Sequence, residues 1–425
     1  MNPLCKSVCL LALVGLHILP CGGSAQTVKE AYEWSSPSLQ QHAAFVILGA
    51  KTKIKPNEFF HASALVDHTF RGVVSPNNDT LYSGLCIDLR ESPQVLTVPD
   101  CSDRYVSVMM TDMRCYNLRV LVNEPGKYVL MVKGFKGHVP KGMTRVETES
   151  DLVNVVIRSE VKGFDDVPNV AKIQNAFKIE PLSVVTNNNR PLDAPPVDSH
   201  WVTRMQWVLD HSPALDPVDR KYADFIRKLK PTPENQAIGA KTLADLQGCA
   251  ETIKETKGMY GRRDRITVDH RTRAASNLYT HLALEIERAA YPRLGVDTDG
   301  KPLVGDRQYT MTMPKDIPLN KGGFWSVTVY DNETKQFVPN DNKLYRIADK
   351  TAVRNADGGV TIHFGGRRGA DKNWLPLPTN GHQWYVLIRL YEGNKEIVEG
   401  TWAVPKIVPN EQGAYDSPAK AKLAR

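Results

Sequence analysis

The sequence predicts an α+β protein in which two antiparallel, sandwich-like β-rich domains are joined by a helical region. Two stretches carry short apolar or alternating runs separated by turn residues, one between about residues 70 and 185 and one after residue 297. Between them, apolar residues recur at helical spacing over residues 198–290. At 425 residues the chain exceeds what one hydrophobic core usually serves, which also favours two domains.

The first 26 residues have the pattern of a secretory signal peptide. Lys6 precedes an apolar run over residues 8–19, and small residues follow it. A run of about twelve residues is too short to span a bilayer, so we expect no transmembrane span. We expect residues 1–26 to be removed and the mature protein to be periplasmic or secreted. An alternative is a lipid anchor at Cys21, which comes directly after the apolar run.

The charge balance is mild. Lys6 is the only charged residue among the first 26, so the remainder has 53 Lys and Arg against 47 Asp and Glu, a net charge of +6. No five like charges follow one another, and we expect no nucleic-acid partner. The densest basic stretch, residues 261–273, is either a site for an anionic ligand or a self-compensating surface with Asp264 and Asp269 as partners, which is the interpretation we prefer.

The first β-rich domain is expected over residues 27–185. It opens with a helical pattern over residues 28–62, whose apolar run ends at Gly49. A strand with its return is expected over 148–163 and a short helix over 167–177. The other strands of this domain are predicted at residues 81–89, 95–98, 105–109, 118–122 and 128–132.

A linker and helical region is expected over residues 186–290, and the second β-rich domain over 291–415. Asp357-Gly358-Gly359 is typical of a hairpin turn. The predicted helices lie at residues 201–209, 217–229, 237–260 and 274–291. The predicted strands lie at residues 308–313, 324–330, 359–364, 384–390 and 397–404.

No motif indicates a metal, a cofactor or a nucleotide. The chain has no CxxC or HExxH spacing, no GxSxG, no P-loop and no GxGxxG, and its histidines are dispersed. We therefore expect no metal and no organic cofactor. Cys249 and three other cysteines follow the leader, and the strand positions of Cys86, Cys101 and Cys115 leave one disulfide among them open.

The first polar segment with the composition of a ligand site covers residues 76–83. Asn77, Asn78, Asp79 and Tyr82 are concentrated at the entry to a predicted strand. They either cap turns through bonds from side chain to backbone or hold a polar ligand.

The second polar segment begins at Arg104 and ends at Asp112. Strand alternation places Asp112 on a face with apolar neighbours, where burial would raise its pKa and suit a general acid or base. The alternative is a structural ion pair with Arg104 or Arg114. Asp79 and Asp112 are thus the two candidate catalytic carboxylates.

The third segment lies in the second domain. Alternation directs Trp325, Val327 and Val329 to one face of a strand, and Phe324, Ser326, Thr328 and Tyr330 to the other. Aromatic rings beside hydroxyl and amide groups suit a ring-shaped ligand with a polar edge. Equally, Trp325 and Trp374 fill a sandwich core. The candidate ligand-binding residues here are Trp325, Tyr330, Asn373, Trp374 and Arg389.

These same segments resemble a family of bacterial proteins that pair two domains of unknown function, DUF1254 and DUF1214. The first domain's pattern is similar to Pro76-Asn77-Asn78-Asp79-Thr80-Leu81-Tyr82-Ser83, Arg104-Tyr105 and Asp112. The second domain's pattern is similar to Phe324-Trp325-Ser326, Tyr330-Asp331, Asn373-Trp374-Leu375-Pro376 and Arg389-Leu390-Tyr391. The resemblance implies a multidomain, β-rich fold with a helical portion and frequent export, and it carries no reaction.

Three hypotheses of function follow. The first is an exported protein that binds a small polar or aromatic ligand in a cleft between the two β-rich domains, through Asn77, Asn78, Tyr82, Arg104, Trp325, Tyr330, Asn373, Trp374 and Arg389. The second is a cofactor-independent hydrolase or lyase that uses Asp79 and Asp112. The third is a surface assembly protein, and a homo-oligomer also stays open.

Overall fold

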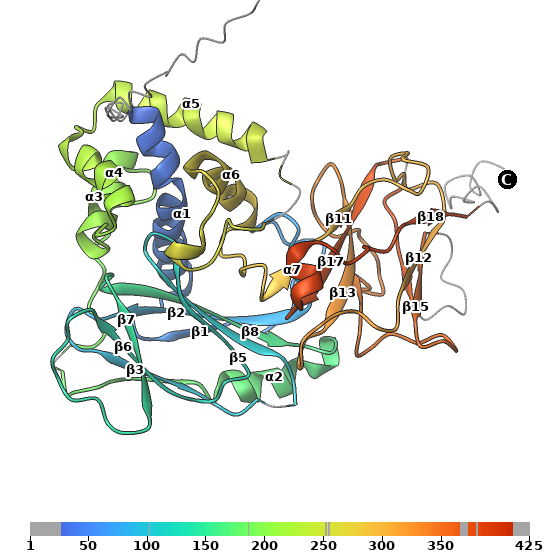
Figure 1. Cartoon of the computed structure of the whole chain (residues 1–425), viewed down its shortest axis with the longest axis horizontal. Helices are drawn as coiled ribbons and strands as arrows, with labels where there is room; N and C mark the ends of the chain where they lie inside the picture. The colour runs from blue at the N-terminus through green and yellow to red at the C-terminus, as the bar shows by residue number, and fades with distance from the viewer. Residues whose placement is uncertain are drawn as a thin grey trace, which may run out of the picture.

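The α+β fold expected from the sequence is confirmed, with two β-sandwiches and a layer of helices (Figure 1). The computed structural model describes residues 27–410, with gaps at 102, 186, 251–252, 254–255, 366–372 and 380. The predicted signal peptide and Cys21 lie outside the described residues. Within the described part of the chain, no helix is both long and apolar enough to cross a bilayer.

The first sandwich consists of two sheets. Sheet 1 is antiparallel throughout, whereas β6 and β7 in sheet 2 pair in parallel. In spatial order, sheet 1 contains β1 (Phe59–His61), β2 (Thr80–Asp88), β8 (Leu152–Glu160), β4 (Val106–Asp112) and β5 (Asn117–Val122). Sheet 2 contains β7 (Met143–Thr148), β6 (Gly126–Val132), β3 (Gln94–Val98) and β9 (Lys178–Pro181).

The two faces of sheet 1 pack against different parts of the molecule. One face meets sheet 2 across a core that includes Leu85, Val155 and Leu130. The other face, which carries Tyr82 and Arg158, meets the helices and the second sandwich. Strand alternation therefore separates a core face from a face on which functional side chains can gather.

The first helix lies at the centre of the helical layer. Figure 1 shows α1 in the middle of the helices that are encoded much later in the chain. Its buried residues include Ser35, Ser36 and Ser38, whose small side chains let neighbouring elements approach closely. The helices of this layer are α1 (Val28–Thr52), α3 (Trp201–His211), α4 (Pro217–Lys228), α5 (Pro233–Ala250) and α6 (His270–Thr280).

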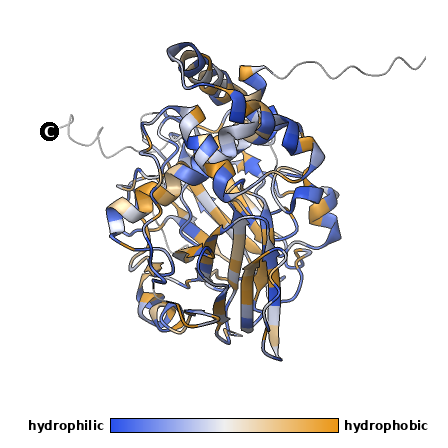
Figure 2. Cartoon of the chain, turned by 90° about the vertical axis from the view of Figure 1, so that its left-hand side faces the viewer, coloured by the Kyte–Doolittle hydropathy of each residue, from blue (hydrophilic) through white to orange (hydrophobic). Residues whose placement is uncertain are grey.

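The second sandwich also has two sheets. Its core contains Trp325, Val327 and Val329 of β13. Figure 2 views the molecule from the side of the first sandwich and the helices, whose elements carry both hydrophobic and hydrophilic residues. Sheet 3 contains β10 (Ala289–Ala290), β17 (Trp384–Tyr391), β13 (Trp325–Asp331) and β14 (Arg346–Ala348), with β11 (Arg293–Leu294) also paired to β17. Sheet 4 contains β16 (Trp374–Leu375), β15 (Val360–Phe364), β12 (Tyr309–Met313) and β18 (Val408–Pro409).

Two predicted elements at the ends of the chain are wrong. The helical pattern over residues 28–62 ends at Thr52, because Lys53 is left-handed with φ of 60° and Pro56 follows, and residues 59–61 form β1 instead. The strand predicted over 397–404 is replaced by the short helix α7 (Lys395–Glu399). Asn394 caps that helix, and Gly400 ends it with φ of 76°.

The helix predicted over 274–291 ends at Thr280. Leu282 is left-handed with φ of 61°, and the chain then crosses the outer face of sheet 1, where Leu284 is fully buried. Burial of this segment among aromatic side chains outweighs its helical pattern. The remaining short helix of the first sandwich, α2 (Val167–Gln174), falls where the sequence predicts it.

The basic stretch over residues 261–273 is a structural anchor. Arg262 pairs with Asp264 at the surface, as the preferred interpretation expects. Two other arginines of this stretch pair with carboxylates of other elements: Arg263 pairs with Asp219 of α4, and Arg271 pairs with Glu33 of α1. The arginines therefore hold helices together.

Asp219 is the carboxylate on which these contacts converge. It is 0% exposed, and it accepts hydrogen bonds from Trp34 Nε1 at 3.0 Å, Arg263 Nε at 2.9 Å and Arg114 Nη1 at 3.4 Å. Burial alone would raise the pKa of Asp219, but the bonds from Arg263 and Trp34 outweigh it and lower the pKa. The carboxylate joins α1, α4 and the turn between β4 and β5.

Replacing Asp219→Asn should lower the free energy of unfolding by about 3 kcal/mol, because the buried Arg114 and the half-buried Arg263 each lose one carboxylate partner. Urea unfolding measures this change. The matched control is Asp264→Asn, which breaks an exposed pair and should cost less than about 1 kcal/mol. Equal losses in the two variants would show that the buried pair does not hold the helical layer.

Candidate functional site

The segment that precedes β2 lies between the two sandwiches. Asn77 Oδ1 accepts the amide hydrogen of Asp79 at 2.6 Å, which shapes the entry to the strand. Asn77 Nδ2 lies 3.2 Å from the hydroxyl of Tyr82 in the first sandwich and 3.2 Å from that of Tyr391 in the second. The Asn77 side chain thus both caps the turn and bridges the two sandwiches.

Asp79 is the charged centre of this junction. Its carboxylate is 0% exposed and accepts hydrogen bonds from Ser326 Oγ at 2.6 Å and from the Tyr391 hydroxyl at 3.2 Å. Arg346 Nε lies 3.3 Å from its other oxygen. All three partners belong to the second sandwich, so this one carboxylate ties the two sandwiches together.

Arg389 forms a second tie beside Asp79. Its guanidinium donates to Tyr330 at 2.8 Å and to the carbonyls of Ser75 and Pro76 at 3.0 and 3.3 Å. The Tyr330 hydroxyl donates to the same Pro76 carbonyl at 2.6 Å. Burial opposes the charge on Arg389, but the neighbouring Tyr330 and Asp79 outweigh it and raise its pKa.

The strand alternation predicted for β13 is confirmed. Ser326 pairs with Arg389 across β13 and β17, and this face carries Phe324, Thr328, Tyr330 and Tyr391 toward the junction. Trp325 is 3% exposed and faces the opposite way, into the sandwich core. It therefore fills the core, the alternative given above, and cannot reach a ligand at the junction.

Asn373 and Trp374 also lie away from the junction, in sheet 4. Asn373 Nδ2 donates to the carbonyls of Val353 and Thr361, and Trp374 Nε1 donates to Gly365 O at 2.8 Å. Both side chains tie backbone segments together. Asn78 does the same near the junction, donating to Val66 O at 2.5 Å.

Arg104 and Asp112 are held by structural bonds at separate places. Arg104 donates to Glu160 O at 2.9 Å and to Asp166 at 2.8 Å. Asp112 accepts the amide hydrogens of Arg114 and Tyr116, both at 2.9 Å, and pairs with the Arg114 guanidinium at 3.4 Å. Arg114 is thus the partner of Asp112, one of the two alternatives above, and burial raises the pKa of Asp112.

The two candidate catalytic carboxylates are not brought together. Asp112 pairs in register with Val153 near one end of β8. Asp79 precedes Thr80, which pairs with Glu160 at the other end of that strand. Seven residues of strand separate Val153 from Glu160, a distance of about 23 Å. The structure therefore offers no shared position at which both could act on one substrate.

A further polar group lies on the outer face of sheet 1, beside the junction. Tyr82, Arg158 and Ser107 form one row across β2, β8 and β4. Tyr105 lies on the same face, where its ring contacts those of Phe324 and Tyr391. Arg158, Tyr105 and Tyr391 are not among the site residues predicted from the sequence. A sequence signal exists only for Tyr391, which lies two residues after Arg389 and therefore on the same face of its strand.

Three buried polar atoms in this row have no hydrogen-bond partner in the described part of the chain. They are Arg158 Nη1, the Tyr105 hydroxyl and Ser107 Oγ, of which the two hydroxyls lie near each other and can share one weak hydrogen bond. A buried polar group without a partner costs free energy, so several on one face indicate an unfilled role. The side chains of Asn77, Tyr82 and Tyr291 are half-buried. We call Asn77, Tyr82, Tyr105, Arg158, Tyr291 and Tyr391 the junction cluster.

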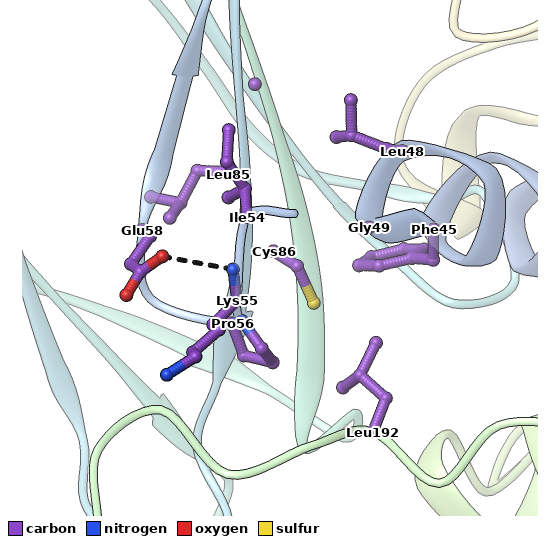
Figure 3. A pocket seen from close by; sticks show the side chains of 11 residues that line it. Phe45, Leu48, Gly49, Ile54, Lys55, Pro56, Glu58, Leu85, Cys86 and Leu192 are labelled. Carbon is purple, nitrogen blue, oxygen red and sulfur yellow. Dashed lines mark hydrogen bonds between the residues drawn. The ribbon is translucent and has the colours of Figure 1, made fainter. Parts of the chain in front are cut away.

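A separate small pocket of about 40 Å³ lies between the end of α1 and strands β1 and β2 (Figure 3). Burial raises the pKa of the Cys86 thiol in it well above its ordinary value. Among the described residues that line this pocket, every buried side-chain nitrogen or oxygen has a hydrogen-bond partner. The pocket therefore offers little to orient a polar ligand. Its walls are mostly apolar: Phe45, Leu48, Ile54, Pro56, Leu85 and Leu192.

The cysteines considered for a disulfide remain thiols. Cys101 lies in the core of the first sandwich, whereas Cys86 and Cys115 lie on the side of the helical layer. The strand positions alone did not reveal these different faces. In the described ranges, no three His, Cys, Asp or Glu side chains converge to hold a metal ion.

The comparisons with family models decide the affiliation of the chain. Residues 56–181 match the model described as a protein of unknown function (DUF1254), and residues 288–395 match the one described as a protein of unknown function (DUF1214). The chain belongs to this two-domain family. Asp79 lies in the DUF1254 match, and Ser326, Arg346 and Tyr391 lie in the DUF1214 match, so the junction joins the two domains.

One solved structure supports the fold. The VPA0106 protein from Vibrio parahaemolyticus has a TM-score of 0.73 at 22% identity, with 90% of this chain and 99% of that chain covered. An uncharacterized protein from Burkholderia cenocepacia reaches a TM-score of 0.45 at 14% identity, with 90% and 88% covered. None of the curated proteins matches this chain.

Asp79→Asn should make the two domains unfold independently, because the contacts across the junction lose the charge of the Asp79 carboxylate. We expect urea unfolding, followed by tryptophan fluorescence and circular dichroism, to change from one transition to two. The matched control is Asp349→Asn, whose carboxylate pairs with Arg354 inside the second sandwich. Coincident transitions in the Asp79 variant would show that other contacts couple the domains.

The ion pair between Arg104 and Asp166 should make stability depend on pH. Burial alone would raise the pKa of Asp166, but hydrogen bonds from Arg104, Lys162 N and Asn169 lower it from 3.8 to about 2. Because the folded pKa is lowered, the stabilisation is present above about pH 4 and is lost as pH falls toward 2, an effect of about 2 kcal/mol.

Denaturant unfolding between pH 2 and 5 tests this dependence with Asp166→Asn. The variant should be less stable than wild type at pH 5 and equal to it near pH 2. Asp165→Asn, at the exposed neighbouring position, should follow the wild type at every pH. A constant difference between wild type and Asp166→Asn at every pH would exclude the ionised carboxylate as the cause.

Proposed function

We propose that this protein is exported and binds a small molecule with a ring and a polar group at the junction cluster. The observation that carries the proposal is the buried Arg158 Nη1, which has no hydrogen-bond partner in the described part of the chain, together with the Tyr105 and Ser107 hydroxyls on the same face, beside a stack of aromatic rings. Aromatic walls with a few convergent polar groups are typical of small-molecule sites. The site also lies where two domains meet, which is a common position for such sites.

The half-buried position of Tyr82 supports its contact with a ligand. Its hydroxyl lies 3.2 Å from Asn77 Nδ2, and its ring lies under the Arg158 guanidinium, 5.4 Å from ring centre to carbon. A ligand that enters between the domains meets Tyr82 before it meets the fully buried Tyr105. Tyr82 is therefore the residue at which binding can be changed with least effect on packing.

The first experiment is native mass spectrometry of the protein purified from the periplasm or medium, compared with its denatured mass. A retained small molecule supports the proposal and identifies the ligand. Tyr82→Leu should lose that molecule while its melting temperature changes by no more than about 4 °C. Tyr222→Leu, on helix α4, is the control for a tyrosine of the helical layer that should retain it. Retention by Tyr82→Leu would place the ligand elsewhere.

Export is the second part of the proposal. Thr27 caps α1 and forms a capping box with Glu30, so the first helix needs nothing before residue 27. The intact mass of the exported protein should show that residues 1–25 or 1–26 have been removed. The mass of a chain that begins at Cys21 and carries acyl groups would show the lipid-anchored alternative. The Cys21→Ser variant would then lack this acylated species. An unprocessed chain would contradict export by cleavage.

A further inference from the structure

Arg158 carries a buried charge that the protein itself does not neutralise. Its side chain is 6% exposed, and Nη2 donates to Leu282 O at 2.6 Å. Within the described ranges, no carboxylate lies within 4.0 Å of it, whereas Arg104, Arg114 and Arg346 each have one. Nη1 has no hydrogen-bond partner. Arg158 is therefore a cation with an open donor.

Other buried arginines without a direct carboxylate make more hydrogen bonds. Arg389 bonds to two carbonyls and two hydroxyls. Arg273 bonds to two carbonyls and lies 4.3 Å from the Tyr116 ring, although its Nε has no partner in the described part of the chain. Arg158 bonds to a single carbonyl and otherwise interacts with the Tyr82 side chain. Burial of a charge without a partner is costly, so its retention points to a partner that binds from outside.

The residues around Arg158 are tyrosines, which do not cancel its charge. Burial raises the pKa of Tyr105 and of Tyr291, so both rings stay neutral at pH 7. Burial opposes the charge on Arg158, but its tyrosine neighbours, including a side-chain hydrogen bond with Tyr82, raise its pKa. The guanidinium thus stays charged in neutral surroundings.

We propose that Arg158 anchors the carboxylate of an aromatic or other ring-containing monocarboxylate at the junction cluster. This rests on the proposed function and adds the charge and class of the ligand. The open Nη1 and the hydroxyls of Tyr105 and Ser107 supply donors on one face, while Phe324 and Tyr391 supply ring surface. A planar monoanion suits this dry, aromatic setting better than a strongly hydrated dianion does.

The route of the chain after α6 explains how this site is formed. Leu282 adopts φ of 61° and presents its carbonyl to Arg158 Nη2, which fixes one side of the guanidinium. Tyr291, nine residues later, and Tyr82 are also neighbours of the guanidinium. The segment that departs from its predicted helix therefore orients Arg158 toward the domain junction.

Isothermal titration with benzoate and benzamide tests the inference, because the two probes share a shape and differ in charge. Wild type should bind benzoate at least about 30-fold more tightly than Arg158→Gln does, as expected for a buried charged hydrogen bond. Benzamide should bind wild type and variant alike. The matched control, Arg119→Gln, removes the same charge from the exposed side of β5 and should retain benzoate.

The outcomes separate this inference from the proposed function. If benzoate binds Arg158→Gln as tightly as wild type, or if benzamide equals benzoate, the charge anchor is wrong and ligand binding at the junction stands. If wild type binds neither probe at about 10 mM and native mass spectrometry shows a bare chain, both are wrong.

Folding of the variant is checked separately. Since Arg158 has no carboxylate, Arg158→Met should melt at or above the wild-type temperature, whereas Arg389→Met should melt well below it. A large loss of melting temperature in Arg158→Met would assign Arg158 a structural role and overturn the inference.

Discussion

The whole arrangement depends on one buried carboxylate, that of Asp79. Its oxygens accept hydrogen bonds from Ser326 and Tyr391 and pair with the Arg346 guanidinium, and these residues come from three strands of the opposite domain. Because a carboxylate without exposure must keep such partners, the two domains cannot separate without leaving a charge unpaired. This constraint holds the rings of Phe324 and Tyr391 against Tyr105, and so fixes the position of the junction cluster.

Asp79 and Arg158 differ in how their charges are paired within one junction. One oxygen of Asp79 accepts two hydrogen bonds and the other pairs with the Arg346 guanidinium, whereas Arg158 keeps an open donor beside neutral tyrosines. A charge that is paired within the chain is typical of residues that hold a fold together, and an unpaired one is typical of sites that receive a ligand. The same contrast explains why Asn78, Asn373 and Trp374, whose side chains bond to the backbone, contribute to architecture.

Much of the architecture could be predicted from local pattern. The alternation of β13 placed Ser326 and Tyr330 on one face and Trp325 on the other, and the pairing of Asp112 with Arg114 was one of two alternatives. The partners of Asp79 could not be predicted, because Ser326 is 247 residues away and no local pattern records that contact. The segment after Thr280 was mistaken for helix, because tertiary burial of Leu284 decides its path.

The central position of α1 has a consequence for the order in which this chain can fold. A helix made first is enclosed by α3, α4, α5 and α6, which are made more than 150 residues later. Its Ser35, Ser36 and Ser38 cannot reach their packed environment until the chain has grown past residue 280. The first helix therefore stays unpacked during synthesis, either exposed to solvent or bound by a chaperone. A protein shortened to the two segments that match the family models would lack this helix at the centre of the helical layer.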